Sequence, residues 1–311
     1  MKKISIIGAG NTGATTAHWL AERELADLVL IDVVDGMPQG KALDMLEAMP
    51  IVNKDVEITG SNDFAATEDS DIIIITAGLA RKPGMSRDDL LSANAEIVGK
   101  AATETLQHSP DAFYIVLTNP LDTMAYLAMK KTGLPRNRVI GQAGILDSAR
   151  MRAFVAMETG VSVENIDCYV LGGHGDEMVP LTRHSNIAGI PLREYLPADK
   201  LEAIVNRTRK GGGEIVNLLK TGSAYYAPSA AVAQMTEAIL KDRNLIVPCS
   251  AYLDGEYGLK DMFFGVPVVL HRGGISRIVE YTLNAEERAH FEKSAASVKE
   301  THDALKKLVK M

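Results

Sequence analysis

A glycine-rich loop at residues 8–13 is the feature of this chain that most restricts its fold. It follows an apolar run at residues 4–7, typical of a buried strand, and precedes a helical pattern over residues 13–25. In a GxGxxG loop with these neighbours, the first glycine permits a tight turn and the second lets the backbone approach a phosphate. The third glycine lets the helix pack against the strand. The predicted nucleotide contacts are Gly8, Ala9, Gly10, Asn11, Thr12 and Gly13.

Further short apolar runs continue the pattern of buried strands. They lack polar alternation, which indicates strands covered on both faces, as in a parallel sheet. Helical patterns lie between them, and this alternation predicts an α/β fold, a Rossmann-type doubly wound parallel sheet. The additional strands are predicted at residues 28–31, 72–75 and 114–117, and the helices at residues 38–48, 92–108 and 121–132.

The pattern changes near residues 144–147, where we place a boundary between two closely packed domains. Residues 1–145 form the predicted nucleotide-binding domain, and residues 146–311 form an α+β catalytic domain. Helices of this second domain are predicted at residues 148–159, 199–220, 228–241 and 286–310, and strands near residues 165–171, 244–252 and 262–270.

Asp32 ends the second predicted strand, 19 residues after Gly13. A carboxylate at this place accepts hydrogen bonds from the ribose hydroxyls of a bound dinucleotide and repels a 2′-phosphate. The sequence therefore predicts NAD, in preference to NADP, as the cofactor.

Composition excludes several other classes of function. The formal net charge of −7 argues against a nucleic-acid or anionic-membrane partner. No apolar run approaches the ~20 residues that span a bilayer, and the apolar stretch after Lys2 and Lys3 is too short for the core of a signal peptide. Cys168 and Cys249 belong to no CxxC pattern, so we expect two buried thiols and no metal site. These features predict a soluble, cytoplasmic protein.

Two loops are expected at the carboxyl edge of the sheet, where open parallel sheets bind ligands. Residues 79–90 follow the third predicted strand and concentrate the positive charge of Arg81, Lys82 and Arg87, which suits a loop that closes over an anion. The second loop follows the fourth strand and places an amide, that of Asn119, within reach of substrate or cofactor. Leu117, Thr118 and Asn119 are predicted cofactor contacts, and Asn94 in the helix after the arginine loop is a further candidate.

Three residues of the second half form a set suited to proton transfer and acid binding. Arg150 follows Asp147 by three residues, so both face one side of a helix, and arginine grips a carboxylate through two parallel hydrogen bonds. His174 lies between Gly173 and Gly175, where backbone and ligand can approach closely. Asp147 is suited to hold one ring nitrogen of His174 and to raise its pKa, which leaves the other nitrogen for a substrate oxygen. The six remaining histidines have no such setting.

The chain resembles the lactate/malate dehydrogenase family over essentially its whole length, most closely the prokaryotic malate branch. The motifs that carry the resemblance are Gly8–Gly13, Asp32, Arg81–Arg87, Leu117–Pro120, Leu146–Arg150 and Gly172–Asp176. The resemblance implies that His174 is the proton donor and acceptor with Asp147 as its partner, and that Arg150 clamps the substrate carboxylate. It also implies that Arg87 polarises the substrate carbonyl after the loop closes and that Asn119 bonds the reacting oxygen.

Arg81 occupies the position at which the family it resembles selects its substrate. Lactate enzymes of that family resemble one another in having glutamine at this position, and malate enzymes in having arginine. The chemistry agrees, because beside a monoacid this arginine would be a desolvated charge without a counterion. We therefore expect interconversion of malate and oxaloacetate, and the resemblance implies a homodimer or homotetramer. A lactate or other 2-hydroxy-acid dehydrogenase and a catalytically silent NAD-binding module remain as alternatives.

Overall fold

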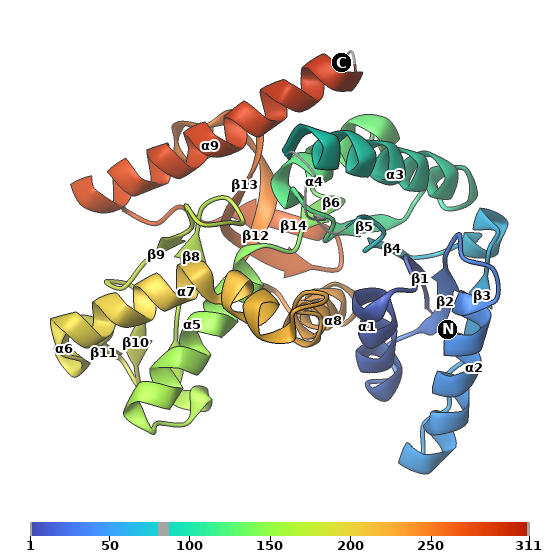
Figure 1. Cartoon of the computed structure of the whole chain (residues 1–311), viewed down its shortest axis with the longest axis horizontal. Helices are drawn as coiled ribbons and strands as arrows, with labels where there is room; N and C mark the ends of the chain where they lie inside the picture. The colour runs from blue at the N-terminus through green and yellow to red at the C-terminus, as the bar shows by residue number, and fades with distance from the viewer. Residues whose placement is uncertain (1, 80–86, 310–311) are drawn as a thin grey trace.

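The computed structural model describes residues 2–79 and 87–309, and in this range nine strands form one sheet through the centre of the molecule (Figure 1). The strand order is β14-β13-β12-β6-β5-β4-β1-β2-β3. The six strands from β3 to β6 are parallel and have the 3-2-1-4-5-6 order of the Rossmann fold. Their bounds are β1 Lys3–Ile7, β2 Asp27–Ile31, β3 Ile58–Ser61, β4 Ile72–Ile75, β5 Phe113–Val116 and β6 Val139–Gly141.

The run of four isoleucines in β4 shows why these strands lack polar alternation. Ile72 and Ile74 pack into the core on one face of the sheet, whereas Ile73 and Ile75 pack into the core on the other face. Both cores are closed by helices, so the side chains on either face are buried. The expected doubly wound sheet is confirmed.

Four helices alternate with the parallel strands, and further helices of the second half complete the two layers. α1 and α8 cover one face of the sheet, and α3, α4 and the end of α9 cover the other (Figure 1). The helices are α1 Asn11–Glu22, α2 Met37–Ala48, α3 Arg87–His108, α4 Leu121–Thr132, α5 Gly144–Thr159, α6 Leu192–Tyr195, α7 Ala198–Leu219, α8 Tyr226–Leu240 and α9 Ala285–Val309. Short 3-10 turns are η1 Met49–Val52, η2 Phe64–Thr67, η3 Val163–Asn165 and η4 Glu256–Gly258.

The second half contributes three antiparallel strands to the same sheet, the long strands β12 Leu245–Asp254 and β13 Lys260–His271 and the shorter strand β14 Gly274–Ile278. β12 pairs with β6 through Ser250 and Gly141. A Cβ at Gly141 would lie 2.7 Å from Cβ of Ser250, so this glycine permits the close approach. The strands expected near residues 244–252 and 262–270 are present, and they extend the parallel sheet.

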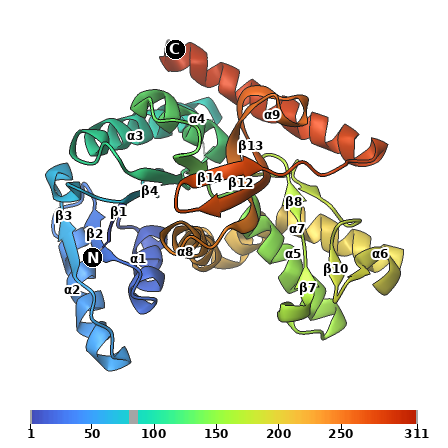
Figure 2. The same cartoon turned by 180° about the vertical axis from the view of Figure 1, so that it is seen from behind.

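Two small sheets lie at the end of the molecule opposite β3 and α2 (Figure 2). One contains β7 Ile166–Asp167, β10 Asn186–Ile187 and β11 Ile190–Pro191, and the other contains β8 Val170–Leu171 and β9 Val179–Pro180. The strand expected near residues 165–171 is thus divided between two sheets. None of the helices within the described residues has an apolar stretch long enough to cross a membrane.

Candidate active site and nucleotide cavity

A cavity of about 550 Å³ lies at the carboxyl ends of β1, β2 and β4. Its wall includes the glycine-rich loop, the residues after β2, the segment 76–79 after β4, and residues of α3. This is the edge at which open α/β sheets bind their ligands. Of the predicted cofactor residues, the cavity is lined by Gly8, Gly10, Asn11, Thr12, Gly13 and Asp32.

The loop has the space that a dinucleotide pyrophosphate needs. Gly8 has a φ of +104°, a conformation that favours glycine, and a Cβ at Gly13 would collide with the carbonyl oxygen of Gly8. Gly10 differs, because nothing lies within 4 Å of the position its Cβ would take. No side chain caps the N-terminus of α1, so this helix end can receive an anion. These features fit NAD.

Asp32 lies directly after β2 and supports the glycine-rich loop. Its Oδ2 accepts a hydrogen bond from the backbone N–H of Ala9 at 2.8 Å, and its Oδ1 accepts one from the N–H of Val34 at 3.0 Å. The side-chain amine of Lys41 donates to the carbonyl oxygen of Ala9 at 2.7 Å. Ala9 is fully buried, and its two backbone hydrogen bonds hold the loop on the side away from the cavity. Each carboxylate oxygen of Asp32 keeps a lone pair that can accept a hydrogen bond from a ribose hydroxyl.

Asn94 holds two backbone segments together. Its Oδ1 accepts from the N–H of Leu79 at 2.7 Å, and its Nδ2 donates to the carbonyl oxygen of Asn119 at 2.7 Å. The Asn94 residue is 1% exposed and does not line the nucleotide cavity. It therefore supports the loop that carries Asn119, and its contact with a cofactor stays a prediction.

The loop after β5 is anchored on one side and open on the other. Thr118 donates through its hydroxyl to the carbonyl oxygen of Ala77 at 2.7 Å, and both Leu117 and Thr118 are buried. Asn119 is exposed, and its contact with a substrate stays a prediction. The cofactor contacts expected of Leu117 and Thr118 also stay predictions.

Asp147 is the centre of the candidate catalytic group. It lies in the first turn of α5, and its side chain is 3% exposed. One carboxylate oxygen, Oδ2, lies 2.9 Å from Nδ1 of His174, and the other, Oδ1, accepts from Nη1 of Arg150 at 3.1 Å. A single carboxylate thus fixes both the imidazole and the guanidinium, and it leaves Nε2 of His174 free to exchange a proton with a ligand.

The surroundings of His174 favour its protonated form. Burial alone would disfavour the charged ring, but the charge and hydrogen bond of Asp147, together with the charge of Asp122, outweigh it and raise the pKa of His174. The nearby guanidinium of Arg150 acts in the opposite direction. A raised pKa keeps a proton available to a substrate oxygen near neutral pH.

Asp122 is a residue of this site to which sequence reasoning gave no role. It lies in the first turn of α4, where its Oδ2 accepts from the backbone N–H of His174 at 3.0 Å and its Oδ1 accepts from the hydroxyl of Ser250 at 2.6 Å. Burial raises the pKa of Asp122, against the effect of these two hydrogen bonds. The residue lies two positions after Pro120, and its place beside the Leu117–Pro120 motif was the available signal.

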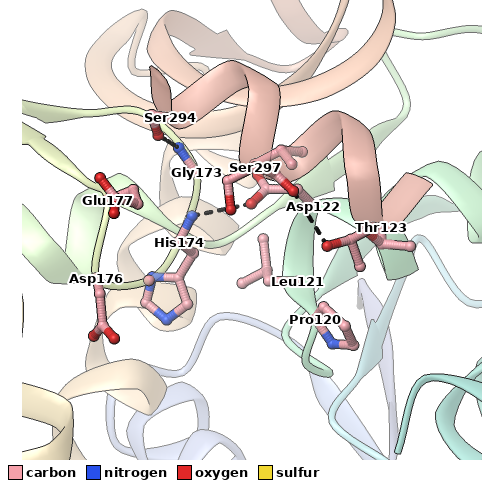
Figure 3. Close-up of a pocket in the computed structure, with 13 residues that line it drawn as sticks. Pro120, Leu121, Asp122, Thr123, Gly173, His174, Asp176, Glu177, Ser294 and Ser297 are labelled. Carbon is pink, nitrogen blue, oxygen red and sulfur yellow. Dashed lines mark hydrogen bonds between the residues drawn. The ribbon is translucent and has the colours of Figure 1, made fainter. Parts of the chain in front are cut away.

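A second, smaller cavity of about 250 Å³ lies beside the His174 loop, between α4 and α9. Figure 3 shows the ring of His174 on the side of its backbone opposite Asp122, and Ser294 of α9 accepting from the N–H of Gly173 at 3.0 Å. The His174 loop is therefore tied by its backbone to α4 and α9, while its ring is held by α5. Three elements far apart in the sequence fix one imidazole.

The segment between α7 and α8 reaches the nucleotide cavity. Gly222, Ser223 and Tyr225 line it, and the hydroxyl of Ser229 donates to the carbonyl oxygen of Thr12 at 2.8 Å. No pattern in the sequence gives a role to a single residue of this segment. Two predicted substrate residues are not placed: Arg81 lies outside the described residues, and Arg87 begins α3 but its side chain is not described. Within residues 2–79 and 87–309, no three His, Cys, Asp or Glu side chains are grouped to hold a metal ion.

Comparisons with family models divide the chain into two parts. Residues 2–141 match the lactate/malate dehydrogenase NAD-binding domain, and residues 145–309 match the lactate/malate dehydrogenase alpha/beta C-terminal domain. Among curated relatives, the malate dehydrogenase of Roseiflexus castenholzii is 59% identical over 306 residues, which cover 98% of this chain and 99% of the relative.

Solved structures agree with these matches. The malate dehydrogenase of Salinibacter ruber superposes with a TM-score of 0.95 at 50% identity, covering 99% of both chains. The lactate dehydrogenase of Cryptosporidium parvum, solved with lactic acid and β-nicotinamide adenine dinucleotide, gives a TM-score of 0.95 at 39% identity over 98% of both chains.

Proposed function

The chain belongs to the lactate/malate dehydrogenase family, and we propose that it interconverts (S)-malate and oxaloacetate with NAD, using His174 as general acid and base. The observation that carries the chemistry is the shared carboxylate of Asp147, which holds His174 at 2.9 Å and Arg150 at 3.1 Å. A histidine bound to a buried carboxylate and lying next to an arginine is suited to give a proton to a keto acid as it is reduced and to remove one from a hydroxy acid as it is oxidised.

The proton step follows from the tautomer that Asp147 imposes. Because Nδ1–H of His174 donates to Asp147, the proton exchanged with the ligand is carried by Nε2. In the reductive direction, protonated His174 gives this proton to the carbonyl oxygen, and in the oxidative direction the neutral ring removes it from the hydroxyl. The cofactor, when bound, supplies the other half of the chemistry: NADH would give a hydride to the carbonyl carbon, and NAD would accept one from the carbon that bears the hydroxyl.

Substrate binding is assigned to the arginines and to Asn119. We propose that Arg150 grips the carboxylate next to the reacting carbon through two parallel hydrogen bonds, which fixes the acid in one orientation. Arg81 is proposed to bind the second carboxylate, Arg87 to polarise the carbonyl, and Asn119 to bond the reacting oxygen. NAD is assigned to the glycine-rich loop and Asp32, whose carboxylate disfavours a 2′-phosphate.

Three further proposals concern the chain as a whole. We place the division between cofactor and substrate domains between residues 145 and 146, which is supported by one family model that ends at residue 141 and another that begins at residue 145. A homodimer or homotetramer is supported by exposed apolar side chains of Leu43 and Leu46 on α2 and of Ile51 beside it. A cytoplasmic location is supported by the buried free thiols of Cys168 and Cys249.

The experiment that tests the function compares oxaloacetate with pyruvate as substrates for NADH oxidation, followed by absorbance. We expect wild-type protein to prefer oxaloacetate by at least ~10³-fold in kcat/KM, because a monoacid offers no second carboxylate to the arginine proposed to bind it. Arg81→Gln should shift the preference toward pyruvate. A preference for pyruvate in the wild type would make the chain a lactate dehydrogenase, and inactivity toward every 2-keto acid would indicate a silent NAD-binding module.

A further inference from the structure

Helix α7 has a buried stripe whose last position is a glycine. The buried residues of this helix are Leu201, Ile204, Thr208 and Gly211, at the three- and four-residue spacing of one helix face. The first three contribute side chains to the interior. Gly211 continues the stripe with no side chain, although glycine is a poor helix former. A glycine at a buried position of a long helix calls for a spatial reason.

The space at Gly211 is occupied by the side chain of Arg150. A Cβ at Gly211 would lie 2.7 Å from Nε of Arg150, 3.3 Å from its Cγ, and closer still to its Cδ. These are the three nearest heavy atoms, and none belongs to the backbone of α5. The glycine therefore accommodates one side chain, and it is not required for the two helices to approach each other.

The next two residues of α7 are also glycines, and they provide an internal comparison. A Cβ at Gly212 would lie 4.0 Å from Nη2 of Arg150, which is an ordinary contact distance. A Cβ at Gly213 would have nothing within 4 Å. Of these three consecutive glycines in α7, only Gly211 lies where the Cβ of any other residue would overlap the side chain of Arg150.

Arg150 is fixed from two sides. Its Nη1 donates to Asp147 at 3.1 Å, and its side chain is 11% exposed. The methylene groups and Nε lie against the backbone of α7 at Gly211. A methyl group there would push a flexible side chain out of its path, while the backbones of α5 and α7 could remain in place. The position of the guanidinium is thus set jointly by a carboxylate at its tip and a glycine along its length.

We propose that Gly211 is a positioning residue for substrate binding, which acts by holding open the path of the Arg150 side chain. This inference rests on the proposed role of Arg150 as the carboxylate clamp. A displaced guanidinium loses its two-point alignment with a carboxylate, and misplacement by about 1 Å reduces rates by up to ~10²-fold.

The test compares Gly211→Ala with Gly213→Ala, which make the same chemical change in the same helix two residues apart. For Gly211→Ala we expect kcat/KM for oxaloacetate to fall by about 10- to 100-fold, mainly through a higher KM, with NADH affinity unchanged. For Gly213→Ala we expect kcat/KM within about twofold of wild type and a melting temperature that does not fall. Equal kinetic behaviour of the two variants would overturn the inference.

A double-mutant cycle shows whether Gly211 acts through Arg150. Arg150→Ala removes Cγ, Cδ and Nε, so in that background Gly211→Ala should cause no further loss of kcat/KM and should not lower the melting temperature. An additional loss of kcat/KM in the double variant, similar to that in wild type, would mean that Gly211 acts by another route. If Gly211→Ala alone does not fold, the melting temperature of the double variant tests the inference in its place. A melting temperature at or above that of Arg150→Ala supports the inference, and a lower one overturns it.

The same cycle separates this inference from the proposed function. If Arg150→Ala leaves the KM for oxaloacetate unchanged, the proposed clamp is wrong and the inference falls with it. If Arg150→Ala raises that KM while Gly211→Ala behaves like Gly213→Ala, only the inference is wrong.

Discussion

The Oδ2 atom of Asp147 lies 2.9 Å from Nδ1 of His174, and both side chains are largely buried. This contact sets the tautomer of the ring, favours its charged form and directs Nε2 toward a ligand. The second oxygen of Asp147 holds Arg150, so the same carboxylate contacts both the proposed proton carrier and the proposed substrate clamp.

Asp147→Asn should impair the enzyme severely while leaving the fold intact. The amide cannot enforce the same tautomer, so kcat for oxaloacetate reduction should fall by about 10²–10⁴-fold. Because Asp147 raises the pKa of His174, the pKa of His174 should be lower in the variant than in the wild type. Reduction requires protonated His174, so the decline of kcat/KM with rising pH should begin at a lower pH. A pH profile with the wild-type midpoint would contradict this account. NADH affinity, measured by fluorescence, is the control.

Asp122→Asn separates charge from position in the same loop. An amide oxygen can still accept from the N–H of His174, and Ser250 can reverse its hydroxyl to accept from the amide. Only the charge that raises the pKa of His174 is lost, so the pH profile should shift to lower pH by less than in Asp147→Asn. Asp122→Ala should in addition lower the free energy of unfolding by about 1–3 kcal/mol, because it removes the acceptor of the part-buried N–H of His174 and of the buried hydroxyl of Ser250.

An unshifted profile in Asp122→Asn would mean that Asp122 is already neutral at the working pH. Burial raises the pKa of this carboxyl, so the direct measurement is its own titration by carboxyl-resolved NMR. Denaturant unfolding of the two variants checks the difference in stability, with equal m-values showing that the native state is preserved.

Asp32→Ser should weaken NAD binding and reduce discrimination against NADP. The serine cannot replace both carboxylate oxygens, which bond the amides of Ala9 and Val34, and it removes the charge that repels a 2′-phosphate. We expect the KM for NADH to rise by about tenfold or more and the NADH-to-NADPH ratio of kcat/KM to fall. Steady-state kinetics with both cofactors measure this, and an unchanged ratio would exclude Asp32 from cofactor selection.

His302 should make the protein less stable in mild acid. It is 1% exposed in α9, its Nε2 lies 3.2 Å from the carbonyl oxygen of Asp122, and burial lowers its pKa from 6.5 to about 4. Between those values the unfolded chain binds more protons than the folded chain, so stability falls as pH decreases from 6.5 toward 4. The loss attributable to this residue is on the order of 3 kcal/mol.

His302→Gln supplies the comparison, because its amide can donate to the same carbonyl without titrating. The difference in unfolding free energy between wild type and variant should be constant above pH 7 and should change in favour of the variant as pH falls. Parallel curves at all pH values would show that His302 does not carry the effect.

The parallel half of the fold could be predicted because its signals are local. Runs such as Ile72–Ile75 are buried on both faces, and four of the six parallel strands were expected within a residue or so of their observed bounds. The other two, β3 and β6, contain only four and three residues, with glycine among them, and too few apolar positions to be distinguished from loops.

Parts of the site depend on contacts that no local pattern records. The pairing of Asp147 with His174 was expected from residue chemistry, and the structure places the two in contact. The structure also connects Asp122 with Ser250, 128 residues away, and Gly211 with Arg150. These relationships arise only when α4, α5, α7 and β12 converge. A sequence shows which residues can perform chemistry more readily than which residues hold them in place.

The Ser250–Gly141 pairing joins the two family-model segments through one continuous hydrogen-bonded sheet. Cutting the chain between them would leave β6 with an open edge and remove β12 from its neighbour, so the N-terminal fragment expressed alone would be prone to aggregate through that edge. Unfolding of the intact chain should accordingly be a single cooperative event. A variant with a long linker inserted between the two segments would still have to form the β6–β12 pairing before it could be active.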